Sequence, residues 1–245
     1  MKIYTFDNKI MTLDGKWMEQ PSAPPAPSLP PYTIRLKFTE GVTPTFAYGT
    51  GVQVSSSPNV WDLTYENTSW YRVLQSQTNL IEVIDANIVG VTILERLFRN
   101  CSNLESVSIF DTSTVTSMYS MFQGCSKLTT VPLFDTSSIS TMTSMFYNCS
   151  KLTTVPLFNT SSVRYMENTF YGCTSLTTVP LFNTSSVSSM YSMFDGCTNV
   201  QSGALALYQQ ASQGTVSNHL YTFRNCGSNT VTGAAELAQI PSDWK

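Results

Sequence analysis

The chain has 245 residues, of which 42% are hydrophobic and only 12% are charged, and its formal net charge is -3. The apolar share suffices for a sizeable core, whereas the charged share is about half of that in ordinary globular proteins. Such a weakly charged chain lacks the basic surface that binding to nucleic acid or to an anionic membrane requires. No stretch approaches the roughly 20 consecutive apolar residues of a membrane-spanning helix.

Residues 1–19 are predicted to form a small β-hairpin segment. Short β-rich runs at residues 3–6 and 10–13 are separated by turn signals, and Asp14-Gly15 is a strong hairpin signal. A lone ribbon of this kind is only marginally stable in water. We therefore expect the segment to attach the chain to a partner or to another copy of itself.

Two further segments precede the regular part of the chain. Proline makes up half of residues 20–31, which predicts a semi-rigid extended linker. From residue 32 to residue 76 the pattern is that of β-strands, since Ile34, Leu36 and Phe38 alternate with polar residues. Because a stack of repeats needs a cap over its first coil, residues 32–76 are predicted to be a small β-rich N-terminal cap.

A phenylalanine recurs every 24 residues through the middle of the chain, and a cysteine follows each one three positions later. The phenylalanines are Phe98, Phe122, Phe146, Phe170 and Phe194, and the cysteines are Cys101, Cys125, Cys149, Cys173 and Cys197. Cys226 has a similar context after a longer interval. A fixed period of this length predicts a solenoid of stacked coils. Together with a degenerate copy around residues 79–83, the solenoid is predicted to span residues 77–226.

Each repeat unit divides into two halves. The first half, Leu128-Thr129-Thr130-Val131 in one unit, predicts a parallel strand of about three or four residues that ends at Pro132. A run of Phe-Asp/Asn-Thr-Ser-Ser then predicts a turn. The second half has the apolar spacing of a short α-helix or 3₁₀-helix. The apolar positions expected in the core of one unit are Leu128, Val131, Leu133, Ile139, Met142, Met145, Phe146 and Cys149.

The last interval departs from the repeat. Residues 202–212 replace the strand and the proline with a helix-like segment, and the chain ends with a second short helical segment in which Leu237 and Ile240 are predicted to face inward. Residues 227–245 are therefore predicted to be a C-terminal helical cap, which hides the open end of the last coil.

The repeat Met-Phe-x-Gly/Asn-Cys-Ser/Thr-x-Leu-Thr-Thr-Val-Pro-Leu-Phe-Asp/Asn-Thr-Ser-Ser-Val resembles the BspA-like leucine-rich repeats of bacterial surface antigens, including related surface-protein repeats of about 24 to 26 residues. The resemblance covers roughly residues 77–226. It implies a leucine-rich-repeat solenoid, that is, a right-handed β/α coil with short parallel strands and short helices. It also implies adhesion or recognition at a bacterial surface, with similar modules in phage-associated proteins.

The cysteines favour a structural role. They share one register at an inward position, where cysteine behaves as a small apolar side chain. We expect a buried ladder of free thiols, with disulfides between neighbouring coils as the alternative. Zinc binding is disfavoured, because the sequence has neither a Cys-x-x-Cys motif nor a cluster of cysteine and histidine.

No pattern in the sequence indicates catalysis. A cysteine nucleophile needs a base within reach, and the single histidine, His219, lies in the irregular last coil. Asp111 and Asp135 stack in register, but Asn159 and Asn183 replace them in later units, which indicates a turn hydrogen bond rather than a pair of catalytic carboxylates. We therefore expect no catalytic residue, no metal site and no cofactor.

Two sets of exposed side chains are candidate binding residues. On the strand side, a hydroxyl array is predicted from Thr129, Thr130, Thr153, Thr154, Thr177 and Thr178. On the opposite, convex side the candidates are Tyr119 and Tyr191 in one register, Tyr147 and Tyr171 in another, and Arg164 with Tyr165. Exposed tyrosines are good anchors for proteins or sugars, although scattered exposed aromatic residues are also common on surfaces without a binding role.

The sequence thus predicts a non-enzymatic recognition or adhesion module that presents its repeat surface to a protein or glycan on a cell or particle. The alternative is a phage or particle structural component, associated with a tail or with receptor binding and joined through the N-terminal β segment. The resemblance implies a cell surface, the extracellular space or a virion as the location. No apolar run of the length of a secretion signal opens the chain, so the sequence alone leaves the location open, including the inside of a cell.

Overall fold

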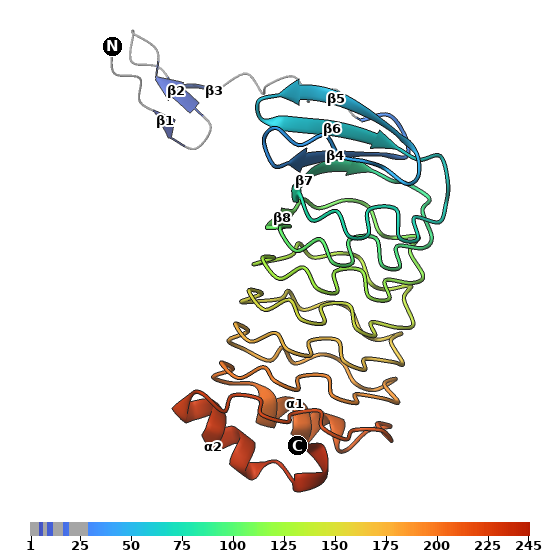
Figure 1. Cartoon of the computed structure of the whole chain (residues 1–245). Helices are drawn as coiled ribbons and strands as arrows, with labels where there is room; N and C mark the ends of the chain where they lie inside the picture. The colour runs from blue at the N-terminus through green and yellow to red at the C-terminus, as the bar shows by residue number, and fades with distance from the viewer. Residues whose placement is uncertain (1–4, 7–8, 12–16, 20–28) are drawn as a thin grey trace.

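The computed structural model describes residues 5–6, 9–11, 17–19 and 29–245. Figure 1 shows a column of stacked coils between a small β-sheet at one end and two short helices at the other. The 24-residue period corresponds to one coil, because parallel bridges join Thr141 to Tyr165 and Tyr165 to Ser189. A single hydrophobic core runs from the sheet through the coils to the C-terminal helices.

A separate three-stranded antiparallel sheet forms near the N-terminus. Its strands are β1 (Thr5–Phe6), β2 (Lys9–Met11) and β3 (Trp17–Glu19), with β2 in the centre. The predicted turn between β2 and β3 lies outside the described residues, and so do residues 20–28 of the predicted linker. The segment that was expected to be a hairpin therefore contains three short strands.

A second sheet, of five strands, forms the N-terminal end of the column. Its strands are β4 (Thr33–Phe38), β5 (Thr50–Ser56), β6 (Asn59–Thr64), β7 (Leu80–Asn87) and β8 (Ser106–Val107). Their order is β5-β6-β4-β7-β8, and all neighbours are antiparallel except β7 and β8. β7 comes from the degenerate first repeat and β8 from the next repeat. The sheet therefore continues across residue 76, where the sequence pattern places the border between cap and solenoid.

Alternation of side chains along β4 orients this sheet over the coils. Ile34 is fully buried in the core, whereas the neighbouring Arg35 lies on the other face and pairs with Asp62 of β6 at 2.8 Å. Directly after the sheet, Trp70 is fully buried and packs edge-on against Tyr65, with ring centroids 5.8 Å apart. These contacts cover the apolar end of the first coil, as the cap of a repeat stack must.

The second half of each coil is built from turns, and the prediction of α-helices or 3₁₀-helices there is wrong. In one unit, the amides of Ser144 and Phe146 donate to carbonyl groups of the next coil, both at 2.9 Å, while the Met145 amide donates to Met142 of its own coil at 3.0 Å. Ser144 and Asn148 both have a φ of 57°, a left-handed conformation that interrupts a helix. Alternate amides therefore hold each turn to its own coil and to the next.

The first half of each coil is also less regular than predicted. β8 has two residues, and no further strand is assigned between residues 108 and 203. The coils that follow are joined there by isolated hydrogen bonds, such as that from the Thr153 amide to the Thr129 carbonyl at 3.1 Å. The prediction of strands of three or four residues is therefore wrong for these coils. Pro156 has no amide hydrogen, so the hydrogen-bond ladder cannot continue through it.

Phenylalanine rings fill the interior of the coils in two columns. Phe146 stacks between Phe122 and Phe170, with ring centroids 5.6 Å and 5.4 Å apart and nearly parallel planes. A ring of the second column, Phe158, lies 6.2 Å from Phe146. Each ring is thus enclosed by its own coil and by both neighbouring coils.

The second phenylalanine column fills core positions that the sequence pattern had predicted for leucine. Leu133 was predicted to face inward, but it is 55% exposed, and the adjacent Phe134 is buried. Successive residues of an extended chain point to opposite sides, so only one residue of each Leu-Phe pair can enter the core. The larger ring fills it, and the leucine faces the solvent.

All six cysteines are free and buried, which confirms the predicted thiol ladder. The Cys149 thiol donates to the Phe122 carbonyl, and the Cys173 thiol donates to the Phe146 carbonyl, both at 3.1 Å. Burial raises the pKa of the Cys101 thiol to about 12. Because the thiolate is the reactive form, these cysteines are structural.

Two helices close the C-terminal end of the column, α1 (Ala204–Ala211) and α2 (Val231–Gln239), as Figure 1 shows. A 3₁₀ turn, η1 (Ser242–Trp244), follows them. The Glu236 carboxylate of α2 accepts hydrogen bonds from the amides of Gly203 and Leu205, at 3.3 Å and 3.1 Å, and so joins α2 to the start of α1. None of the helices in this described region has the length and hydropathy needed to cross a bilayer.

The inward side chains of the cap match the expectation. Ile240 is fully buried and Leu237 packs partly buried against the core. The Trp244 ring lies over Phe223, the phenylalanine of the last coil, with ring centroids 6.3 Å apart. The C-terminal residues therefore extend the column of rings by one more aromatic side chain.

Candidate functional site

The turn halves of the coils together form one surface, which we call the turn face. It carries most of the exposed tyrosines and arginines of the solenoid. The side chains that define it are Tyr71, Arg72, Glu95, Arg96, Arg99, Tyr119, Tyr147, Glu167, Tyr171, Tyr191, Tyr221 and Arg224. Because each coil repeats the same backbone, these side chains stand in columns that run along the solenoid.

Tyr147 and Tyr171 are the most regular pair on this face. Their rings stack with centroids 4.7 Å apart and an interplanar angle of 5°. Both are half-buried, and burial, together with the neighbouring Tyr171 and Asp195, raises the pKa of the Tyr147 phenol. The two stacked rings form a preordered aromatic pair at the middle of the turn face, which we call the aromatic platform.

Tyr119 and Tyr191 share one register but are separated by two coils, whose residues at this position are Thr143 and Glu167. Tyr119 instead contacts Arg96, whose guanidinium carbon lies 5.1 Å from the centre of its ring. Tyr191 packs edge-on against Tyr221, with ring centroids 5.9 Å apart. The structure therefore places these two candidates at opposite ends of the turn face.

The sequence pattern did not single out the other side chains of this face, and among them Tyr71, Arg72, Arg96 and Tyr221 form aromatic or cation–π contacts. Arg96 lies over the rings of both Tyr71 and Tyr119, and Arg72 lies over Tyr71 at 4.7 Å. The signal was available, since counting two periods of 24 residues back from Tyr119 leads to Tyr71.

Arg164 and Tyr165 lie at the start of the turn half of their coil. Tyr165 is 48% exposed, and its backbone forms parallel bridges to the coils on both sides. A shallow hollow there is lined largely by hydroxyl groups, from Ser162, Arg164, Tyr165, Ser185, Ser186, Ser188 and Thr215. The pair thus forms a second exposed group next to the tyrosine columns.

The strand-side threonines divide into two kinds. The hydroxyls of Thr153 and Thr177 each donate to a carbonyl of the preceding coil at 3.2 Å, and Thr129 does so at 3.5 Å. These hydroxyls stabilise the coil stack and are only partly available to a ligand. The neighbouring Thr130, Thr154 and Thr178 are exposed and remain as the accessible part of the predicted hydroxyl array.

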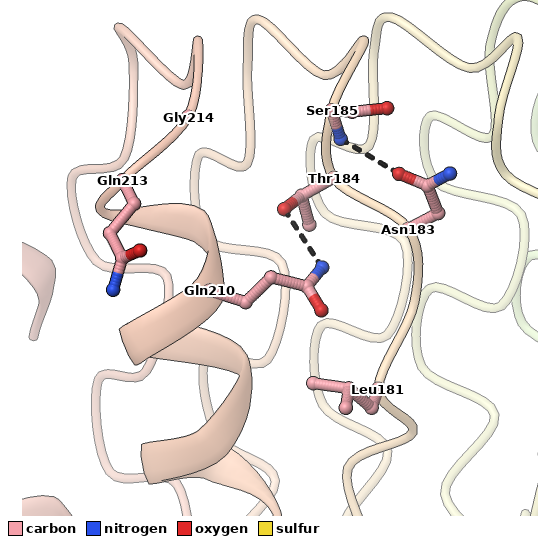
Figure 2. Close-up of a pocket in the computed structure, with 7 residues that line it drawn as sticks. All are labelled: Leu181, Asn183, Thr184, Ser185, Gln210, Gln213 and Gly214. Carbon is pink, nitrogen blue, oxygen red and sulfur yellow. Dashed lines mark hydrogen bonds between the residues drawn. The ribbon is translucent and has the colours of Figure 1, made fainter.

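A row of exposed apolar side chains next to these threonines was not foreseen. Ile109, Leu133, Leu157 and Leu181 share one register, and each is more than half exposed. At its C-terminal end the row reaches a hollow beside α1, which Figure 2 shows with Leu181, Asn183, Thr184, Ser185, Gln210, Gln213 and Gly214. The Gln210 amide donates to the Thr184 hydroxyl at 3.1 Å, so this hollow is a joint between α1 and the last regular coil.

His219 and Asp135, which carry side chains of the kinds used in catalysis, form stacking and turn contacts in this fold. His219 stacks on Trp244 with ring centroids 4.3 Å apart, and its Nε2 lies 3.2 Å from the Asp243 carboxylate. Asp135 accepts hydrogen bonds from the hydroxyl and the amide of Ser137, which lower its pKa. Within the described residues no group of three or more histidine, cysteine, aspartate or glutamate side chains converges as a metal site would require.

Comparisons with known proteins match the repeat region. The family described as "Mycoplasma protein of unknown function, DUF285" matches three overlapping stretches, residues 68–175, 92–206 and 150–230. A crystal structure of a leucine-rich repeat protein from Bacteroides ovatus ATCC 8483 aligns at 20% identity with a TM-score of 0.33, over 49% of this chain and 38% of that one. This chain therefore spans less than half of that protein. The comparison with curated proteins gives no significant match.

Proposed function

We propose that this chain, which belongs to the family described as Mycoplasma proteins of unknown function, DUF285, is a non-enzymatic repeat scaffold that recognises a protein or glycan through its turn face. The stacked pair of Tyr147 and Tyr171 is the observation that carries the proposal. Half-buried tyrosines on a rigid backbone lose little conformational entropy when they bind, which is why such residues dominate binding surfaces.

The backbone beneath the platform supports this role. The Asn148 amide donates to the Tyr171 carbonyl at 2.7 Å, directly beside the two rings. Hydrogen bonds of this kind fix the spacing of the columns before any ligand arrives. A preordered surface of this type favours recognition, whereas catalysis needs a nucleophile or a titrating group that the buried thiols do not supply.

The resemblance to BspA-like repeats suggests where this recognition occurs, namely at a cell or particle surface. A second candidate is a structural component of a phage or other particle, with the sheet of β1, β2 and β3 as the attachment point. One observation favours this candidate: among the residues that the structure describes, these strands pair with one another and not with the five-stranded sheet, as a separate attachment element would.

A pair of matched variants tests which face binds. The full chain is applied to a glycan array and used in pull-down experiments from host lysate. Tyr147→Ala with Tyr171→Ala removes the aromatic platform, whereas Thr130→Ala with Thr154→Ala and Thr178→Ala removes the accessible hydroxyls of the strand side. We expect the tyrosine variant to lose the specific partner and the threonine variant to keep it. The reverse result would transfer the proposal to the strand side, and binding unchanged in both would overturn it.

A further inference from the structure

Three arginines gather at the N-terminal end of the turn face, in a chain that has only 13 lysines and arginines. They are Arg72, Arg96 and Arg99, on two adjacent coils, and we call them, with Tyr71 and Tyr119, the arginine cluster. Arg35 and Arg224 each form an ion pair with an aspartate. Among the described residues, the three arginines of the cluster have no such partner.

The nearest acidic side chain does not neutralise the cluster. Glu95 lies on the same coil as Arg96, but its carboxylate accepts a hydrogen bond from the Ser117 hydroxyl at 2.7 Å and forms no ion pair within the described residues. The Nε–H groups of Arg96 and Arg99 are buried without a hydrogen-bond partner. Unpaired donors of this kind are unfavourable for the fold, so folding alone does not explain the cluster.

Tyrosine rings hold two of the guanidinium groups in place. Arg96 lies between Tyr71 and Tyr119, at 5.7 Å and 5.1 Å from the ring centres, and it donates to the Tyr71 hydroxyl at 2.7 Å. Arg72 covers the same Tyr71 ring at 4.7 Å. A guanidinium that is already ordered loses less entropy when it forms a pair of hydrogen bonds to a carboxylate.

The backbone under the cluster is unfavourable for arginine. Arg72 and Arg96 have φ values of 60° and 56°, a left-handed conformation that favours glycine and asparagine. The equivalent positions of the next four coils hold only small polar residues, namely Ser120, Ser144, Asn168 and Ser192. Long charged side chains therefore occupy two strained positions where the next four coils use small residues, while the last coil has Tyr221 there with a φ of 60°. Strained backbone positions of this kind cluster at binding sites.

We propose that the arginine cluster binds an acidic, carboxylate-rich segment of a protein partner. Charge complementarity identifies the ligand chemistry, because three guanidinium groups without an ion-pair partner among the described residues can donate their remaining N–H groups to carboxylates. Arginine and tyrosine together are also the residues most enriched at the energetic centres of protein interfaces. The site belongs to the turn face and therefore depends on the recognition role proposed above.

The test measures binding of a fluorescein-labelled oligoglutamate peptide to the full chain by fluorescence anisotropy, at low and at physiological salt. We expect binding that weakens with salt. Arg72→Gln with Arg96→Gln should weaken it by at least about tenfold, while lysine at both positions should retain part of it. Lys151→Gln, which removes one exposed positive charge outside the cluster, serves as the control and should change affinity by less than about twofold. Thermal unfolding followed by circular dichroism checks that each variant is folded.

Three outcomes would overturn the inference. They are no binding of the peptide by the wild-type chain, equal loss of affinity in the Lys151→Gln control, or binding of heparin, but not of the peptide, that depends on Arg72 and Arg96. The last result would assign the cluster to a sulfated glycan. If the peptide fails to bind while partner capture still depends on Tyr147 and Tyr171, the arginine inference falls and the recognition proposal stands.

Discussion

Phe122 and Phe146 lie on successive coils with ring centroids 5.6 Å apart and planes within 1° of parallel. The two residues are separated by one 24-residue period, so the spacing in the sequence corresponds to the distance between neighbouring coils in space. Cys125 and Cys149 follow the same rule, as do Tyr147 and Tyr171 on the outside. The columns of side chains in the core and on the surface therefore result from the same 24-residue spacing.

Phe146→Ala is expected to lower the free energy of unfolding by about 3–5 kcal/mol, because it removes a fully buried ring that contacts both neighbouring coils and leaves a cavity. Urea unfolding followed by circular dichroism measures the loss. Leu157→Ala is the matched control, since this side chain is 62% exposed and its truncation should cost less than about 1 kcal/mol. Equal losses in the two variants would show that the inward and outward sides are assigned wrongly.

Alkaline pH is expected to destabilise the fold through the thiol ladder. Burial raises the pKa of Cys101 from its usual 9.0 to about 12, so between pH 9 and pH 12 the unfolded chain loses a proton that the folded chain keeps. Stability is therefore fully present below pH 9 and falls as the pH rises. Unfolding free energies at several pH values measure the slope.

Cys101→Ala provides the comparison for that slope. Removing one titrating thiol should reduce the fall in stability by up to about 1.4 kcal/mol per pH unit. An unchanged slope would contradict the raised pKa. Thiol titration of the wild-type chain is a second readout, and it should find six reactive cysteines only after denaturation.

Asn148 tests the left-handed positions of the turn halves. Its φ is 57°, and glycine stands at the equivalent positions Gly124 and Gly172. Asn148→Gly should therefore change stability by less than about 0.5 kcal/mol, whereas Asn148→Val should cost about 1–2 kcal/mol, because a β-branched side chain clashes in this conformation. Thermal unfolding distinguishes the two variants. A valine variant as stable as the glycine variant would rule out the left-handed turn.

Much of the inside of this molecule could be predicted from its sequence. The period of Phe98, Phe122 and later copies indicated one coil per 24 residues. The cysteine positions indicated a buried ladder, because a small apolar side chain repeated in one register suits the interior of a stack. The sequence also indicated the two helical segments that contain Leu205 and Leu237, because the residues there depart from the repeat pattern. These inferences depend only on which residues recur.

Other features could not be read from the pattern. The spacing of Met142, Met145 and Phe146 fits a helix and a pair of turns equally well, and only the left-handed Ser144 and Asn148 decide between them. The choice between Leu133 and Phe134 depends on where the chain bends after the proline. The 24-residue register does give the positions of Tyr71 and Tyr119, but it does not show that the Arg96 side chain between them contacts both rings.

The most direct test of the central claim, that residues 24 positions apart lie beside each other on successive coils, is a disulfide between introduced cysteines. Tyr147→Cys combined with Tyr171→Cys places two exposed thiols in register, where the Cα atoms of adjacent coils lie about 5 Å apart and within disulfide reach. Mild oxidation followed by peptide mass spectrometry should find the introduced pair linked. The combination of Tyr147→Cys with Tyr191→Cys, which are not in register, should stay reduced. No disulfide in the first variant, or equal linkage in both, would contradict the account.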